Sequence, residues 1–149
     1  MRALGLFLLI AGALGASAAG PEARDKHVEA ALVPEVSGVA PGKAFTLAVR
    51  LRMDEGWHTY WKNPGDSGMP TSVEWELPEG FAAGELRWPV PERIDVAGII
   101  SYGYHGEVWL LTEISVPAGW AGPEATIGAR VSWLMCKEEC IPEIGRAHV

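Results

Sequence analysis

The amino-acid sequence predicts an all-β domain of the immunoglobulin-like sandwich type, and three observations support this fold class. Apolar and polar residues alternate with a period of two through much of the chain. No stretch of about 11 or more residues keeps a helical period without an interrupting glycine or proline. Seven short strand-like runs are separated by Pro-Gly, Pro-Glu-Gly and Gly-Pro turns, and this spacing is typical of a sandwich.

The first three predicted strands lie before residue 62. A run over His27–Val33 is followed by a clearer one over Ala44–Met53, in which every odd-numbered residue from Phe45 onward is apolar. Because successive side chains of a strand point to opposite faces, these apolar residues share one face and are predicted to be buried. The third run, Trp57–Trp61, places two tryptophans and a threonine on one face, which is also predicted to face the core.

Four further runs complete the predicted strands. Over Ser72–Leu77, three apolar residues alternate with Glu74 and Glu76, so that one face is apolar and the other acidic. The remaining predicted strands have similar alternation and are Glu85–Trp88, Val108–Val116 and Ala125–Met135.

The two ends of the chain are predicted to lie outside a domain over residues 20–143. Residues 1–19 have the pattern of a signal peptide, with Arg2, an apolar stretch over 4–14 and a small-residue cleavage site, so we expect export. Residues 144–149 look like the translation of a sequencing adapter and are predicted to be a non-native tail. On that view the sandwich lacks its last strand and exposes an unpaired edge.

Composition excludes several classes of protein. The chain has 12 Lys+Arg against 19 Asp+Glu, a net charge of -7 and no basic run, so no nucleic-acid partner is expected. Beyond the first residues, no apolar run approaches the ~18 residues of a membrane span. Two cysteines are too few for a disulfide-dense scaffold, so the core must come from ordinary hydrophobic packing.

Cys136 and Cys140 offer the reactive side chains of the sequence, and their spacing leaves three interpretations open. A structural disulfide in so short a ring stabilises by about 2 kcal/mol, against about 4 for a loop of about 60 residues. Neighbouring cysteines are also typical of dithiol exchange. A metal site would need further ligands, none of which lies at a recognisable spacing; the candidates are His27, His58, His105, Met69 and Met135.

A second candidate feature is the segment Tyr102-Gly103-Tyr104, which is predicted to be turn-like. Aromatic residues on an exposed loop often form a lid or contact a partner. Two surface tyrosines without a role are an equally good interpretation of the sequence.

Four ordered motifs between about His27 and Pro142 resemble the N-terminal periplasmic domain of DsbD-type thiol:disulfide interchange proteins, in particular the ScsB-like branch. These motifs are Gly-Trp-His-Thr-Tyr-Trp-Lys-Asn-Pro-Gly-Asp-Ser-Gly at 56–68, Trp-Pro-Val-Pro-Glu-Arg at 88–93, Ser-Tyr-Gly-Tyr at 101–104 and Cys-Lys-Glu-Glu-Cys-Ile-Pro at 136–142. The resemblance implies an immunoglobulin-like domain without a cofactor. It also implies electron transfer from a membrane-embedded domain to periplasmic thioredoxin-fold proteins, including disulfide isomerases and cytochrome c maturation factors.

The resemblance further implies roles for individual residues. Cys136 and Cys140 match the redox pair, with Cys140 as the thiol that attacks the partner's disulfide. The segment 99–104 matches a cap loop, so Tyr102 and Tyr104 are expected to act as a lid that Gly103 allows to open. In this segment Ser101 replaces the phenylalanine of well-known members, and no acid lies between 97 and 104. The competing hypotheses are an immunoglobulin-like binding or chaperone domain with a structural disulfide, and a copper-binding module.

Overall fold

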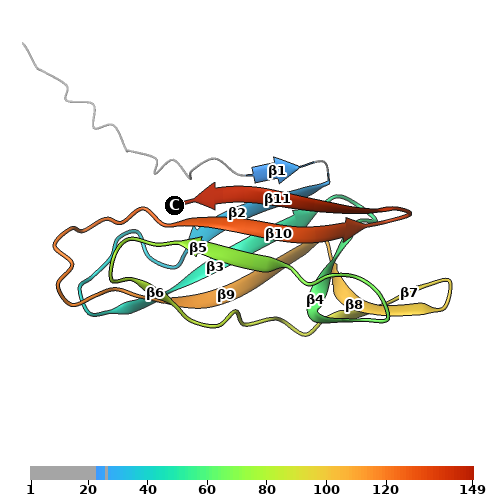
Figure 1. The fold of residues 1–149 in the computed structure, drawn as a ribbon, viewed down its shortest axis with the longest axis horizontal. Helices are drawn as coiled ribbons and strands as arrows, with labels where there is room; N and C mark the ends of the chain where they lie inside the picture. Colours follow the sequence, from blue (N-terminus) through green and yellow to red (C-terminus); the bar gives the residue numbers. More distant parts are fainter. Residues whose placement is uncertain (1–22, 26) are drawn as a thin grey trace, which may run out of the picture.

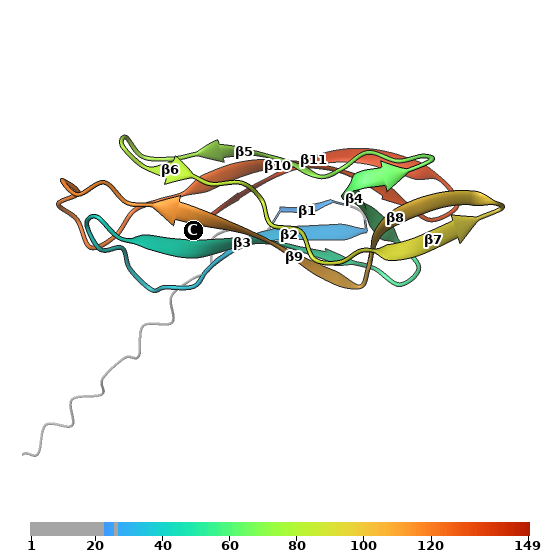
Figure 2. The same ribbon diagram turned by 90° about the horizontal axis from the view of Figure 1, so that it is seen from below.

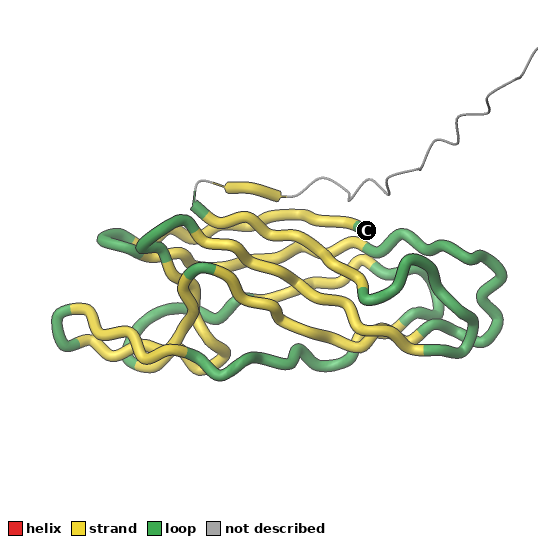
Figure 3. The backbone as a smooth tube through the Cα atoms, turned by 180° about the vertical axis from the view of Figure 1, so that it is seen from behind, coloured by secondary structure: helices red, strands yellow, loops and turns green. Residues whose placement is uncertain are grey.

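The computed structural model describes residues 23–25 and 27–149, which form eleven strands and contain no helix (Figures 1 and 3). The predicted signal peptide lies outside the described residues. Within the described part, no helix with the length and apolarity of a membrane span is found.

The strands form two antiparallel sheets that pack face to face, as the two layers in Figure 2 show. The fold is therefore the predicted all-β, immunoglobulin-like sandwich. The first sheet has the order β1 (Ala23–Asp25), β2 (Val28–Pro34), β3 (Ala44–Met53), β9 (Glu107–Ser115) and β6 (Ala82–Ala83). The second has the order β11 (Cys140–His148), β10 (Gly128–Cys136), β4 (His58–Gly65), β8 (Ile99–His105) and β7 (Glu92–Val96), and β5 (Ser72–Glu76) also pairs with β10.

The core lies between the sheets and follows the predicted alternation. The odd-numbered residues of β3 from Phe45 to Met53 are all buried, which confirms the face predicted for this strand. From the second sheet, β10 contributes Trp133, which is only 2% exposed. Full burial of a large apolar side chain is worth roughly 1.5–3 kcal/mol, so this alternating set provides the main stabilisation.

Most predicted strands are confirmed, but the prediction of a strand over Glu85–Trp88 is wrong. In that segment Arg87 makes a single bridge to Leu111, with N···O distances of 2.7 and 3.1 Å. Pro89 and Pro91 follow directly, and because proline has no N–H group, they prevent a longer ladder. Four paired segments were not predicted from the sequence, namely β1, β6, the β7–β8 hairpin and β11.

The predicted absence of the last strand is wrong. Residues 140–148 form β11, which pairs with β10 along its length, so β10 has partners on both sides. A three-residue turn returns the chain, and the alternation of the last residues lets Ala147 enter the core at 4% exposure. Val149 also exchanges two backbone hydrogen bonds with Ile127, of 2.8 and 2.9 Å. The non-native origin of residues 144–149 stays a prediction.

The ends of three strands meet at one end of the sandwich and position the cysteines. Cys136 ends β10 and Cys140 begins β11, so both lie beside the hairpin turn. On the other side of β10, Cys136 pairs with His58 at the start of β4. The β7–β8 hairpin pairs with β4 at this same end (Figure 1).

Candidate redox site

Cys136 and Cys140 form a disulfide across the β10–β11 hairpin, with an S–S distance of 2.05 Å and a Cα–Cα distance of 4.2 Å. The turn between them is closed by a backbone hydrogen bond of 3.1 Å from Lys137 to Glu139. Burial separates the two cysteines, because Cys136 is 3% exposed whereas Cys140 is an exposed residue. A partner molecule can therefore approach Cys140, while Cys136 is shielded behind it.

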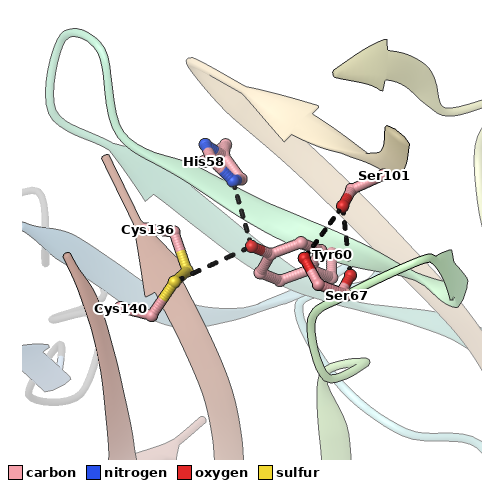
Figure 4. Close-up of a disulfide and its surroundings, with 6 residues drawn as sticks. All are labelled: His58, Tyr60, Ser67, Ser101, Cys136 and Cys140. Carbon is pink, nitrogen blue, oxygen red and sulfur yellow. Dashed lines mark hydrogen bonds between the residues drawn. A yellow bond between two sulfur atoms is a disulfide. The ribbon is translucent and has the colours of Figure 1, made fainter. Parts of the chain in front are cut away.

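Two side chains of β4 lie against the disulfide (Figure 4). The hydroxyl oxygen of Tyr60 is 4.0 Å from the Sγ atom of Cys140. The same hydroxyl is 3.2 Å from Nε2 of His58, within hydrogen-bond distance. His58 and Tyr60 are two residues apart on a strand and so share one face, and each is 4% exposed. The sulfur, the phenol and the imidazole thus form a continuous buried row that begins at the exposed cysteine.

The loop after β4 is fastened to β8 by polar contacts. Asp66 accepts a 3.0 Å hydrogen bond on its carboxylate from the backbone N–H of Ile100 and donates its own backbone N–H to the Ile100 carbonyl at 2.8 Å. Ser101 donates from its hydroxyl to the carbonyl of Ser67 at 3.1 Å (Figure 4). The side chain of Ser101 thus holds this loop in place.

The same loop fixes the ring of Tyr60. Gly68 has a φ of +111°, a conformation that favours glycine, and a Cβ atom at this position would overlap the Tyr60 ring. The backbone of the loop therefore packs directly on one side of the ring. With the disulfide near its hydroxyl end, the phenol has little freedom to leave the sulfur.

A hollow of about 420 Å³ lies beside the cysteine turn and is lined by Trp57, Lys137, Glu138 and Glu139. Lys137 donates from Nζ to the carbonyl of Glu55 at 3.4 Å, which fastens the turn to the loop before β4. The hollow has an aromatic wall and charges of both signs, and it is open to a partner that approaches Cys140.

Burial determines the charge of the two β4 side chains. Burial, and secondly the charge of His105, lower the pKa of His58 below its usual value, and burial raises the pKa of Tyr60. Both groups are therefore neutral at pH 7. His105 lies on β8 with its ring 5.3 Å from that of His58, and its Nδ1 atom is 2.9 Å from a carboxylate oxygen of Glu92 on β7.

The segment Tyr102-Gly103-Tyr104 is part of strand β8, so the prediction that it is turn-like is wrong. Gly103 pairs with Tyr60, and a Cβ atom on it would overlap the carbonyl of Thr59. Its φ is not among the positive glycine angles, so it permits close strand approach rather than a hinge-like conformation. The tight β4–β8 pairing explains why glycine occurs here.

The two tyrosines of β8 make their contacts away from the sulfurs. Tyr104 is 5% exposed, and its hydroxyl donates to the carbonyl of Pro89 at 2.8 Å; burial raises its pKa to about 12. Tyr102 is 37% exposed and meets Trp61 edge to face, with ring centroids 6.5 Å apart. Tyr104 pairs with Thr59, so the register places it on the strand face opposite Tyr60.

The role of Tyr102 and Tyr104 as a lid stays a prediction, and single substitutions test it. Tyr60→Ala is expected to speed reduction of the disulfide by a small thiol, because it removes the ring beside Cys140. Tyr102→Ala is expected to leave that rate within about twofold of the wild type, since its ring packs on Trp61. Rates are followed by thiol release, with melting curves as the control for folding. A larger acceleration by Tyr102→Ala than by Tyr60→Ala would establish the β8 lid instead.

Of the residues considered as metal ligands, only His58 and His105 are described above as neighbours. His27 stacks on Trp57 at 4.0 Å and contacts the carboxylate of Asp54 at 3.1 Å. Met135 is fully buried in the core, whereas Met69 is 54% exposed. Over the described residues, no group of three or more His, Cys, Asp or Glu side chains is placed to hold a metal ion.

The sequence analysis missed the row of His58 and Tyr60 and the loop that packs on it. His58 was considered only as a metal candidate or an ordinary strand residue, and the loop motif was given no role. The sequence contains one signal for this row. His58 and Tyr60 alternate with Trp57, Thr59 and Trp61, which are predicted to face the core, so His58 and Tyr60 are expected on the opposite face of the strand. What they face depends on the pairing of β4 with β10, which alternation cannot reveal.

A sandwich with a two-cysteine ring at the tip of one hairpin, one cysteine exposed and the other buried, has the features of a thiol-disulfide exchange domain. The chain belongs to the family of N-terminal domains of the thiol:disulfide interchange protein DsbD, whose model matches residues 28–148.

A solved structure with a TM-score above 0.5 shows the same fold. The N-terminal periplasmic domain of ScsB from Proteus mirabilis has 21% sequence identity and a TM-score of 0.60, covering 84% of this chain and 47% of that one. This chain thus spans about half the length of that structure. The reduced N-terminal domain of DsbD from Neisseria meningitidis has 18% identity and a TM-score of 0.43, covering 79% of this chain and 83% of that one. No curated protein sequence matches the chain.

Proposed function

We propose that this domain is a protein-disulfide reductase module that takes electrons from a membrane-embedded partner domain and passes them to periplasmic thioredoxin-fold proteins. The observation that carries the proposal is the exposed Cys140, joined to the buried Cys136 in a short ring. Disulfide isomerases and cytochrome c maturation factors are the proposed clients. Family membership and the pattern of residues 1–19 support a periplasmic location.

In the proposed reaction the reduced domain donates two electrons and two protons. The thiolate of Cys140 attacks one sulfur of the client's disulfide, a new S–S bond forms, and the client's other sulfur leaves as a thiolate. The thiolate of Cys136 then attacks Sγ of Cys140, which restores the ring and releases the client's second thiolate. The protons from Cys136 and Cys140 end on the two client thiols. The membrane-embedded dithiol then reduces the ring again.

A redox titration tests the proposal against a purely structural disulfide. A relay pair is expected to be half reduced at about -180 to -230 mV, the range of isomerases and glutaredoxins, whereas structural disulfides resist reduction to below about -300 mV. The chain is equilibrated with glutathione buffers, free thiols are alkylated, and the two forms are separated by mass. A midpoint potential below about -300 mV would favour the alternative, an immunoglobulin-like binding module in which the disulfide has only a structural role.

A further inference from the structure

We propose that Tyr60 and His58 form a proton relay for the thiol of Cys140, in which Tyr60 contacts the reacting sulfur and His58 is a positioning residue that acts through Tyr60. The inference rests on the proposed function, because it concerns the reduced state of the same cysteine. It adds a proton pathway to the exchange and assigns it to two residues of β4.

The geometry of the row supports the relay. The Tyr60 hydroxyl lies between the other two groups, 4.0 Å from the Cys140 sulfur and 3.2 Å from His58 Nε2. A phenol hydroxyl has one proton to donate and an oxygen that accepts, so it can contact two partners with opposite roles. The row leads from the exposed cysteine to an imidazole that is 4% exposed, so a proton can pass without bulk water.

The hydrogen-bond directions depend on the state of the sulfur. When Cys140 is a thiol, S–H donates to the Tyr60 oxygen, and Tyr60 donates to Nε2 of His58. When Cys140 is a thiolate, Tyr60 donates to the sulfur, and a protonated Nε2 donates to the Tyr60 oxygen. Conversion of the first state into the second therefore moves one proton from sulfur to Tyr60 and one from Tyr60 to His58. The thiolate gains a hydrogen bond that stabilises its charge, which lowers the pKa of the thiol.

His58 accepts that proton together with formation of the thiolate, because its surroundings by themselves favour the neutral ring. Burial, and secondly the charge of His105, keep its imidazole neutral at pH 7, when it can act as a base. The negative charge that forms on the sulfur then compensates the positive charge on the ring, so the two groups titrate together. Other titratable or charged groups of the packed elements include Asp66 in the loop after β4, His105 and Glu92 on the β7–β8 hairpin, and the turn residues Lys137, Glu138 and Glu139. Further along these elements lie Lys62 on β4 and Arg93 and Asp95 on β7.

The loop after β4 keeps the relay assembled. Gly68 packs on the Tyr60 ring without room for a Cβ atom, and the loop is fastened to β8 through Asp66 and Ser101. A phenol that swung away from the sulfur would have to displace this backbone. The loop therefore holds the hydroxyl near the thiol.

The test measures the alkylation of Cys140 in the reduced full chain by iodoacetamide between pH 5 and 10, read by mass spectrometry. Tyr60→Phe removes the hydroxyl, whereas His58→Gln keeps a polar side chain of similar reach that cannot accept a proton. Each variant is expected to slow alkylation at pH 7 by about three- to tenfold and to shift the profile to higher pH. The double variant is expected to be alkylated no more slowly than Tyr60→Phe alone, because loss of the Tyr60 hydroxyl already disconnects His58 from the sulfur.

Tyr102→Phe and His27→Gln are the matched controls, and both are expected to keep the wild-type profile because their side chains pack elsewhere. Melting curves of the oxidised variants verify folding, and if His58→Gln melts early, His58→Asn takes its place because its amide likewise cannot accept a proton. A wild-type profile for His58→Gln, or effects of the two substitutions that multiply, would overturn the relay. Alkylation needs no redox partner, so this result stands apart from the midpoint that tests the proposed function.

Discussion

Replacement of Cys136 by serine is expected to turn the domain into a trap for its clients. The exposed Cys140 still attacks the client's disulfide, but no neighbouring thiol remains to resolve the mixed disulfide. With a purified thioredoxin-fold isomerase in its oxidised form, we expect most of the variant to migrate as a covalent complex on a non-reducing gel. Addition of a reductant is expected to release both proteins.

Cys140→Ser is the matched variant, because it leaves one cysteine of the pair at the same turn. Cys136 is 3% exposed, so its thiol is hidden from a client and little complex is expected. If Cys140→Ser formed the complex and Cys136→Ser did not, the roles of the two cysteines would be reversed. Equal trapping by both would show that burial does not decide which sulfur reacts.

Gly103→Ala is expected to give the largest loss of stability among single-methyl changes at the site. The added Cβ atom would overlap the backbone carbonyl of Thr59, which cannot rotate away as a side chain could. The two strands must separate, so the β4–β8 pairing weakens together with the position of His58 and Tyr60. We expect a loss of about 3 kcal/mol or more in the free energy of unfolding and a fall of roughly 10 °C in Tm.

Gly119→Ala is the control, because a Cβ atom there meets nothing within 4 Å and its φ is not in the left-handed region. Its effect is expected to stay within about 0.5 kcal/mol. If Gly103 were the hinge of a lid, alanine would change the rate of reduction of the disulfide and leave the melting curve in place. Thermal unfolding and reduction by a small thiol, measured on the same samples, separate the two roles.

Alternation allowed most of the sandwich to be predicted from the sequence. The buried face of β3 was predicted from its odd-numbered apolar residues, because a strand with one buried face has an apolar residue at every second position. The alternation of apolar and polar residues is weaker in the β7–β8 hairpin, since only Ile94 is buried on β7 and Gly103 interrupts the pattern on β8. β11 was missed because its origin was doubted, although its residues alternate between buried and exposed in their second half.

The site was predictable only in part. The pair Cys136 and Cys140 could be proposed because cysteine chemistry is specific and their separation is short. Tyr60 could not, since its contact with Cys140 joins residues 80 positions apart through the pairing of β4 with β10. Such a contact depends on sheet order, which a single sequence does not record. The role of Tyr102 and Tyr104 as a lid stays a prediction, and the packing of the loop through Gly68 on Tyr60 was not predicted.

The position of the disulfide within one hairpin has a consequence for how far the domain must rearrange when the bond forms or breaks. Cys136 and Cys140 already face each other in the register of β10 and β11, so the ladder, rather than the S–S bond, holds them together. We therefore expect gain and loss of the bond to leave the outline of the molecule almost the same, with the rearrangement confined to the turn between β10 and β11.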